Sequence, residues 1–526
     1  MKTSLFFLLS ALLSAADYDL LIRRARISDG TGNPWFNADV GIKDGKIAAV
    51  GNLADTTADR TIDAKGRILA PGFIDVHTHL EGNVERMPGA ENFITDGVTT
   101  AITGNCGGSE TDLAAFFERL EKLHTGFNVA SFIGHNSVRS EIMGAANRQA
   151  TPEEIARMQR LIAKNMRDGA IGFSTGLIYI PGTYANTDEV IALAKAAAQF
   201  HGVYASHMRD EGERVLEAIE EAVRVGKESG MPVQLSHFKI DNQRLWGSSD
   251  RSLALVEKFR REGVDVVIDQ YPYDRSSTGL SIQIPSWALA DGRPKFRQRI
   301  ADPATRARIV ADMKKNNADL GHQDFSWCMI ASCDFDHSLD GKNISEVNVL
   351  KGREKNLESE IDTILELHAQ GDISMVYHSM GFEDVERIMM YPNTAIASDG
   401  WIIKFGSGVP HPRSYATNAR VFSEFVRKRR VLRLEDAVRR MTSLPARTFG
   451  FRDRGMIREG YWADLVLFDP DRVEDAATFE KPHQYSKGFD YVLVNGTVVA
   501  EDGKPTGAKP GKVLRRNGTQ AVIARK

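Results

Sequence analysis

Two histidines that lie two residues apart end an apolar segment near the start of the chain. The segment runs from Ile74 to His79 and contains His77. Residues two apart on a β-strand point their side chains to the same face. Two imidazoles on a buried face cost free energy unless they are hydrogen-bonded or bind a metal ion. The pair predicts a metal site, and two hydrogen-bonded core histidines are the ordinary alternative.

Four further residues with metal-binding or acid–base side chains occur where other strands are predicted to end. His207 and His237 are 30 residues apart, about one strand–helix repeat, and each follows a serine. Cys106 lies in a glycine-rich turn, and Asp399 precedes Gly400. Imidazole, thiolate and carboxylate are ligands of Zn²⁺. The set predicts a zinc centre with Asp399 as general base. The alternative for Asp399 is a hydrogen bond to a metal-bound histidine.

Basic and aromatic residues near the same strand ends predict a site for an anionic group of a substrate. Lys239 is two residues after His237, so on a strand it shares the face of that histidine, and a cation aimed into a cavity needs an anionic partner. The alternatives are ion pairs of the cations with Asp or Glu, and core positions for the tyrosines. The residues predicted to contact the substrate are Lys239, Arg413, Tyr271, Tyr273 and Tyr179.

The segments that carry these residues alternate with helical patterns, which is typical of strand–helix units and a parallel sheet. Enzymes on α/β barrels place their chemistry at the C-terminal edge of the strands. We therefore predict an α/β fold, a (β/α)8 TIM-like barrel. The run ending at Tyr377 and His378 exceeds the strands that a barrel needs, so we assign it to a long insertion between strands 7 and 8 that covers the active-site mouth. Arg209-Asp210-Glu211 predicts the start of a helix, where the helix dipole favours carboxylates.

Short alternating strands with hairpin turns occur at both ends of the chain, for example around Asp44-Gly45 and Asn495-Gly496. They predict one small β-sandwich built from both termini. The expected boundaries are 1–16 for an export signal, 17–70 and 454–526 for the sandwich, 71–284 and 379–453 for the barrel, and 285–378 for the insertion.

The first 16 residues have the three parts of a secretory signal, namely a basic start, an apolar run and small residues before a cleavage site. The apolar run, Leu5 to Leu13, is far shorter than the ~20 residues that cross a bilayer as a helix. We expect an exported protein, periplasmic or secreted, with no transmembrane segment in the mature chain. A buried N-terminal strand or a short membrane tether is the alternative.

The composition excludes several classes of protein. The 67 Lys and Arg residues nearly balance the 70 Asp and Glu residues, and a formal charge of −3 argues against a nucleic-acid-binding protein. Hydrophobic residues make up 42% and charged residues 26% of the chain, unlike a disordered protein. Three cysteines are too few for a disulfide scaffold; Cys328 and Cys333 either pair or remain buried thiols.

A series of motifs in order along the chain resembles the amidohydrolase superfamily, and more narrowly its N-acyl-D-amino-acid deacylase (D-aminoacylase) branch. The general motifs are Gly72 to His79 and Ser398-Asp399-Gly400. The motifs of the branch are Thr103 to Gly107, Gly172 to Leu177, Ser206 to Glu211, Ser236 to Lys239, Tyr271-Pro272-Tyr273 and His411-Pro412-Arg413. The resemblance extends from about residue 17 to residue 500. Other branches use a carboxylated lysine on strand 4, where this chain has Ser174-Thr175.

The resemblance implies a tightly bound zinc ion held by Cys106, His207 and His237. It implies a second, weaker metal position formed by His77 and His79 together with Cys106. The glycines beside Cys106 fit this role because the backbone must approach the metal closely.

The implied reaction is hydrolysis of the amide bond of small N-acyl-D-amino acids to a carboxylate and a free D-amino acid, with the α-carboxylate bound by the basic residues. The preference for D-amino acids comes from the resemblance alone. A dipeptidase for peptides with a C-terminal D-residue is a neighbouring alternative. A cyclic amidohydrolase is disfavoured by the missing lysine on strand 4. An inactive barrel used as a small-molecule binding module is disfavoured by the complete set of ligands.

Overall fold

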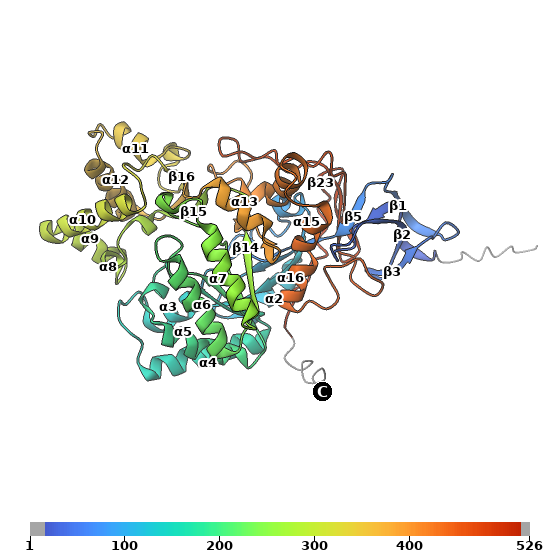
Figure 1. The fold of residues 1–526 in the computed structure, drawn as a ribbon, viewed down its shortest axis with the longest axis horizontal. Helices are drawn as coiled ribbons and strands as arrows, with labels where there is room; N and C mark the ends of the chain where they lie inside the picture. The colour runs from blue at the N-terminus through green and yellow to red at the C-terminus, as the bar shows by residue number, and fades with distance from the viewer. Residues whose placement is uncertain (1–15, 517–526) are drawn as a thin grey trace, which may run out of the picture.

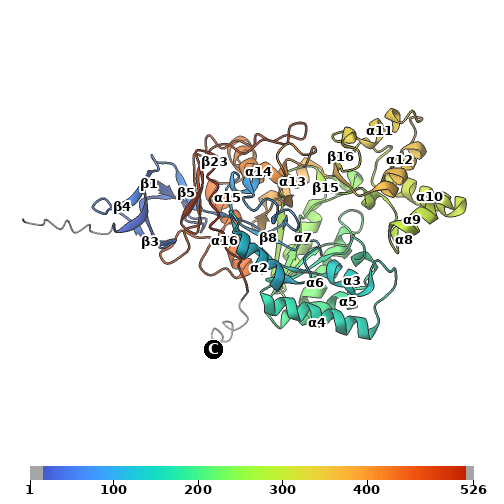
Figure 2. The ribbon, with the colours of Figure 1, turned by 180° about the vertical axis from the view of Figure 1, so that it is seen from behind.

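The computed structural model describes residues 16–516. The expected export signal covers residues 1–16, of which 1–15 lie outside the described residues, so the signal stays a prediction. Three parts lie in a row in Figure 1, namely a sheet from both termini, a central barrel and an insertion, and the view from behind in Figure 2 shows the same order.

The central part is an eight-stranded parallel barrel, which confirms the predicted fold class. Its third strand is interrupted at Phe132 and continues as a second short piece. The barrel closes where β7 (Thr78–His79) and β19 (Gly400–Trp401), which follow the first and last strands, pair in parallel. The barrel strands are β6 (Phe73–Asp75), β8 (Val98–Thr103), β9 (Asn128–Ser131) with β10 (Ile133–Gly134), β11 (Gly172–Gly176), β12 (Val203–His207), β13 (Val233–Leu235), β14 (Val266–Gln270) and β18 (Thr394–Ile396).

The barrel strands are short, almost entirely buried runs, which is typical of a parallel sheet covered on both faces. Helices α4 to α7 pack side by side against them. Helix α4 begins with a capping box, in which the side chains of Thr151 and Glu154 each accept a hydrogen bond from the backbone nitrogen of the other, and Pro152 occupies its first position. The helices of this part are α1 (Glu91–Ile94), α2 (Leu113–Leu123), α3 (His135–Met143), α4 (Pro152–Asp168), α5 (Thr187–Ala198), α6 (Val215–Ser229), α7 (Ser249–Arg261), α13 (Phe382–Met390), α14 (Arg413–Arg420), the π-helix η5 (Val421–Lys428), α15 (Leu434–Met441) and α16 (Ser443–Phe449).

The sequence predicted one small β-sandwich built from both termini, and the two ends of the chain do meet in one β structure. It is a single hydrogen-bonded sheet of nine strands, in which β5 from the N-terminal part pairs antiparallel with β20 from the C-terminal part. Apolar side chains from both ends, including Ile22, Ile42, Leu467 and Leu493, share a core. The strands are β1 (Tyr18–Ile27), β2 (Phe36–Lys43), β3 (Lys46–Gly51), β4 (Ala58–Asp63), β5 (Ile68–Pro71), β20 (Leu465–Phe468), β21 (Phe489–Val494), β22 (Thr497–Glu501) and β23 (Lys504–Pro505).

The insertion lies between β14 and β18, the seventh and eighth barrel strands, and has a hydrophobic core of its own. It begins at Ser276, before the expected residue 285, because its first strand pairs with the strand that ends at Tyr377. Cys328 and Cys333 are buried in this core as free thiols and do not pair. Its elements are β15 (Ser276–Gly279), α8 (Ser286–Leu289), α9 (Arg293–Ala301), α10 (Pro303–Asp319), β16 (Cys328–Cys333), α11 (Ile344–Leu350), α12 (Leu357–Gln370) and β17 (Ile373–Tyr377).

Within residues 16–516, no helix has both the length and the apolar character that a membrane crossing requires.

A glycine at the start of a barrel strand gives a test of this packing. A Cβ atom on Gly172 would overlap the backbone oxygen of Val203 and lie 2.7 Å from its nitrogen, and neither backbone atom can move without disturbing the barrel. We expect Gly172→Ala to lower the free energy of unfolding by about 1–3 kcal/mol, the usual cost of overpacking. Gly51→Ala is the control, since a Cβ there meets no atom within 4 Å. Equal melting temperatures for the two variants would contradict this packing.

Candidate metal centre and active site

The predicted metal ligands meet at the C-terminal edge of the barrel. Each one is supplied by a strand end or by the turn that follows it. His77 follows β6, His79 ends β7, Cys106 follows β8, His207 ends β12 and His237 follows β13.

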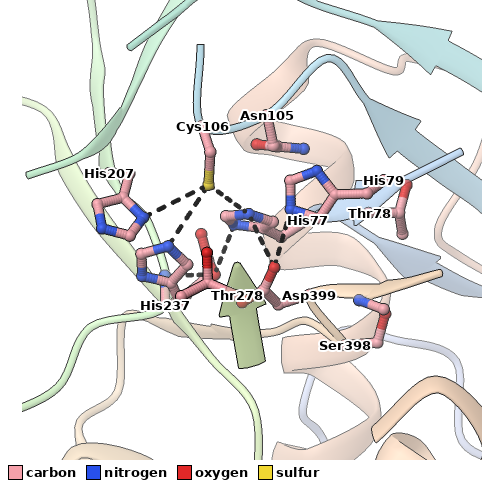
Figure 3. Close-up of polar contacts among 12 residues, drawn as sticks. His77, Thr78, His79, Asn105, Cys106, His207, His237, Thr278, Ser398 and Asp399 are labelled. Carbon is pink, nitrogen blue, oxygen red and sulfur yellow. Dashed lines mark hydrogen bonds and ion pairs between the residues drawn. The ribbon is translucent and has the colours of Figure 1, made fainter. Parts of the chain in front are cut away.

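The sulfur of Cys106 is the centre of the cluster (Figure 3). Its Sγ lies 3.2 Å from Nε2 of His77, 3.6 Å from Nδ1 of His207 and 3.5 Å from Nε2 of His237. The ligand atoms of Cys106, His207 and His237 lie within 4.8 Å of one another, as do those of His77, His79 and Cys106. The structure therefore brings together both sets of ligands that the resemblance implied, and they share one sulfur.

Asp399 lies beside the same cluster. Its Oδ1 is 3.0 Å from Nε2 of His79 and 3.4 Å from Nε2 of His77. Together with His77 and His237, it forms a third group whose ligand atoms lie close enough to share a metal ion. The geometry thus places the predicted general base within reach of the metal position and also in contact with two histidines.

Three of these residues have a left-handed backbone, which non-glycine residues adopt at a cost. The φ angles are 52° for Cys106, 36° for His237 and 51° for Asp399. In this conformation the chain turns sharply after each strand, and the turn directs the side chain into the cluster. Strain of this kind is concentrated at functional sites.

The structure gives a steric reason for the glycines on either side of Cys106, which were expected to let the backbone approach a metal ion. Gly104 and Gly107 have φ angles of 78° and 74°, and a Cβ on Gly104 would lie 2.9 Å from the backbone nitrogen of Phe132. A Cβ on Gly107 would lie 2.7 Å from the backbone nitrogen of Gly176. The glycines allow the Cys106 turn to pack against the next two strands.

The structure corrects the expectation for Lys239. Its ammonium group is buried and lies 2.8 Å from each carboxylate oxygen of Glu211 and 2.7 Å from Nδ1 of His237. The two contacts with Glu211 make Lys239 part of a buried ion pair, and it is not among the residues that line the cavity above the cluster. The alternative of an ion pair with an acidic residue is what the structure shows.

Glu211 is a residue of the site that the sequence analysis missed. The expectation that it starts a helix is wrong, because α6 begins at Val215. Its Oε1 lies 3.0 Å from Nδ1 of His237, and its Oε2 lies 3.5 Å from Nε2 of His207. Burial raises the pKa of Glu211, but the charges of Lys239 and His237 outweigh burial and keep that pKa below its ordinary value. Glu211 is therefore an ionised group behind two of the ligands.

Asp269 was also missed and holds the site from another side. It is fully buried at the end of β14, and its Oδ1 accepts a hydrogen bond of 2.8 Å from the backbone nitrogen of His237 and lies 3.4 Å from Nδ1 of His77. A carboxylate inside an apolar strand was the signal in the sequence, since such a group is buried only with partners.

Arg413 lines the cavity beside Asp399, and it forms the ion pair with an acidic residue that was the alternative for this cation. It is buried, its guanidinium lies 2.9 Å from Oδ2 of Asp399, and it donates a hydrogen bond of 3.2 Å to the backbone oxygen of Ser277. Burial raises the pKa of Asp399, but the charges of Arg413 and His77 outweigh burial and lower it well below its ordinary value. Asp399 is therefore a carboxylate.

The three predicted tyrosines have different positions. Tyr179 lines the cavity, accepts a hydrogen bond of 3.1 Å from Thr278, and has its ring 4.6 Å from that of His207. Tyr271 is buried beneath Arg413, whose guanidinium lies 4.6 Å above its ring. Tyr273 packs in the core against His411, so the core alternative holds for this residue.

A cavity of about 1260 Å³ opens above the cluster between the barrel and the insertion. Cys106, His237, Asp399 and Arg413 line its barrel side, and Ser374 of β17 lies on its insertion side. The volume is sufficient for a small organic substrate.

The donor set fits zinc. Thiolate and imidazole are the ligands that Zn²⁺ favours, and Cys106 and His237 are among the residues that line the cavity. Burial raises the pKa of the Cys106 thiol, but the charges of His77 and His237 outweigh burial and lower it well below its ordinary value. A cysteine that favours the thiolate in a buried cluster of histidines is typical of a metal ligand.

Comparison with known proteins supports this description. A model of the amidohydrolase family matches residues 60–500. The chain is 35% identical to a D-aminoacylase of Alcaligenes xylosoxydans xylosoxydans over 522 residues, which is 95% of this chain and 98% of that protein.

Two solved structures are similar along nearly the whole chain. A D-aminoacylase studied for the functional role of its binuclear metal centre has a TM-score of 0.82 at 34% identity, with 95% of this chain and 100% of the other covered. An N-acyl-D-glutamate deacylase from Bordetella bronchiseptica, in complex with zinc and a phosphonate inhibitor, has a TM-score of 0.81 at 33% identity, with 95% and 99% covered. The chain belongs to the amidohydrolase family.

Proposed function

We propose that this protein is a zinc-dependent hydrolase that cleaves the amide bond of N-acyl-D-amino acids and releases a carboxylate and a free D-amino acid. The observation that carries the proposal is the cluster around Cys106, in which one sulfur and three imidazoles lie beside an ionised Asp399 at the floor of a cavity. The D-aminoacylase and the N-acyl-D-glutamate deacylase that the chain resembles act on substrates of this class.

Cys106, His207 and His237 would hold one zinc ion, and His77 and His79 with Cys106 a second, weaker one. When bound, Zn²⁺ polarises a carbonyl group and makes water a better nucleophile. Cys106 belongs to both of these sets of residues.

Asp399 moves the proton. Its carboxylate is ionised and borders the cavity, so it can accept a proton from the attacking water and return it to the amide nitrogen as the amine leaves. Arg413 on Oδ2 and His79 on Oδ1 fix the orientation of the carboxylate.

Arg413 binds the α-carboxylate of the substrate. It lines the cavity beside Asp399, and a guanidinium forms paired hydrogen bonds with a carboxylate. Tyr271 supports the guanidinium from below through a cation–π contact. The substrate carboxylate is thereby placed next to the group that transfers the proton.

Glu211 orients two of the zinc ligands. It contacts the ring nitrogens of His207 and His237 that face away from the cluster, and Lys239 holds its two oxygens in place. Such partners fix the tautomer and the direction of a ligating imidazole.

We propose that the protein is exported by its N-terminal segment. The support is the three-part pattern of residues 1–16.

A panel of paired substrates tests the reaction and its stereochemistry. We expect the zinc-loaded protein to release amino acid from N-acetyl-D-amino acids and to act far more slowly on the L-enantiomers, with product measured by an amine-reactive assay. L-D dipeptides in the same panel distinguish a dipeptidase. Equal rates on D and L partners, or hydrolysis of hydantoins alone, would contradict the proposal.

Replacement of the general base separates catalysis from metal binding. We expect Asp399→Asn to keep the zinc content per chain and to lower kcat by about 10²- to 10⁴-fold, the usual contribution of a positioned acid–base group. Asp334→Asn, on the same cavity, is the control and keeps its activity. Loss of zinc from Asp399→Asn would make the residue a ligand, and near-normal turnover would exclude it as the base.

Replacement of the group behind the ligands tests their orientation. We expect Glu211→Gln to weaken zinc binding by about 10- to 100-fold in a chelator competition, because a neutral amide holds the two histidines and Lys239 poorly. The exposed Glu217→Gln is the control. The double variant Glu211→Gln with Lys239→Met removes the unpaired buried charge. If the double variant bound zinc as the wild type does, Glu211 would serve only to neutralise Lys239.

A further inference from the structure

An exposed tryptophan lies at the mouth of the cavity next to the metal centre. Trp401 is 43% exposed although it follows Asp399 by only two residues, and its side chain lines the cavity. Aromatic and other apolar side chains that line a cavity are the usual contacts of an apolar ligand group.

The backbone of Trp401 is held rigidly, although the side chain is exposed. Its nitrogen donates a hydrogen bond of 3.2 Å to Oγ of Ser414, and its oxygen accepts one of 2.9 Å from Nδ2 of Asn92. The residue also pairs with His79 where the barrel closes. The indole is therefore presented from a fixed support, which lowers the entropy that a ligand contact costs.

Apolar side chains line this side of the cavity near Trp401, together with the cations Arg86 and Lys404. Its ring stacks on the imidazole of His79, with centroids 5.0 Å apart and planes 25° apart. Met87, in the loop between β7 and α1, and Ile402 and Ile403, in the loop after β19, line the cavity. These loops are tied together by a hydrogen bond of 2.9 Å from Asn83 to the backbone oxygen of Ile402.

The order of contacts across the site gives the direction of a bound substrate. Arg413 contacts one oxygen of Asp399, and His79 contacts the other at 3.0 Å. Trp401 lies beyond His79. With the substrate carboxylate on Arg413 and the scissile amide at Asp399, the group on the far side of the amide carbonyl extends past His79. That group is the acyl chain.

We propose that Trp401, together with Met87 and Ile403, forms the acyl subsite, and that the preferred substrates carry an aromatic or extended apolar acyl group rather than an acetyl group. The inference rests on the proposed deacylase function and adds the substrate class. An acetyl methyl is too short to cover the indole, whereas a phenyl ring joined through one methylene removes apolar surface of both partners from water.

The test compares N-acetyl and N-phenylacetyl derivatives of the same D-amino acid with wild type and variants. We expect the wild type to have a kcat/KM about tenfold or more higher for the phenylacetyl substrate, the range of selectivity that an apolar pocket provides. Trp401→Ala removes most of this preference, chiefly through a higher KM for the phenylacetyl substrate, and Trp401→Phe retains part of it.

The control is Phe405→Ala, since Phe405 is 55% exposed in the same loop but packs against His483 and Tyr485 rather than lining the cavity. It keeps the wild-type preference. Zinc content of Trp401→Ala is measured to separate loss of the acyl contact from disturbance of His79.

The outcomes separate the two proposals. A wild type that shows no preference, or a Trp401→Ala variant that slows both substrates equally, overturns the acyl subsite and leaves the deacylase function standing. If neither compound is hydrolysed, the deacylase function is wrong. Calorimetry with the zinc-loaded protein then tests the acyl subsite. The subsite requires that the phenylacetyl compound bind more tightly than the acetyl compound, and that this difference disappear in Trp401→Ala.

Discussion

The burial of several charged and polar groups at one point is the constraint on which the rest of this structure depends. The sulfur of Cys106 touches three imidazoles, and none of these rings can be buried without a partner on its other side. Three carboxylates contact the histidines of the cluster: Glu211 lies beside His237, Asp269 beside His77 and Asp399 beside His79. Lys239 and Arg413 then balance two of these carboxylates. The site is thus a layered arrangement in which each charge is compensated by the next one outward.

The barrel provides what this arrangement requires, which is a rigid ring of strand ends. Cys106, His237 and Asp399 have left-handed backbones, and a residue in this region costs of order 1–3 kcal/mol. Only a well-packed surround can hold such strain. The buried strands and the close packing of the turn around Gly107 supply it, and the terminal sheet and the insertion carry their own cores. Within the cluster, this strain falls on three residues that follow barrel strands.

The sequence predicted the barrel, the insertion and the residues that meet at Cys106. Each strand end can be recognised from a few neighbouring residues, and the C-terminal ends of all strands of a parallel barrel meet at one edge. It misplaced Lys239 because the rule of two residues per strand face assumes that the strand continues. In the structure β13 ends at Leu235, and His237 has a positive φ, so the alternation of faces stops there. Glu211 was missed because its partner Lys239 is 28 residues away. Its neighbours in the sequence suggested instead the start of a helix, where the helix dipole favours a carboxylate. Contacts between distant turns, like the shape of the insertion, depend on the assembled fold.

The pairing of β5 with β20 has a consequence for how the chain reaches its native state during synthesis. Leu69 pairs with Leu467, so one edge of β5 stays open until β20 has left the ribosome. All four residues of β5 are buried in the finished protein, and an apolar edge left open for that time favours association with other chains. The entropic cost of closing so long a loop grows only slowly with its length. The time for which the edge of β5 is open therefore matters more than the length of the loop. The pairing of β5 is therefore a late event that requires the chain to have been synthesised past β20.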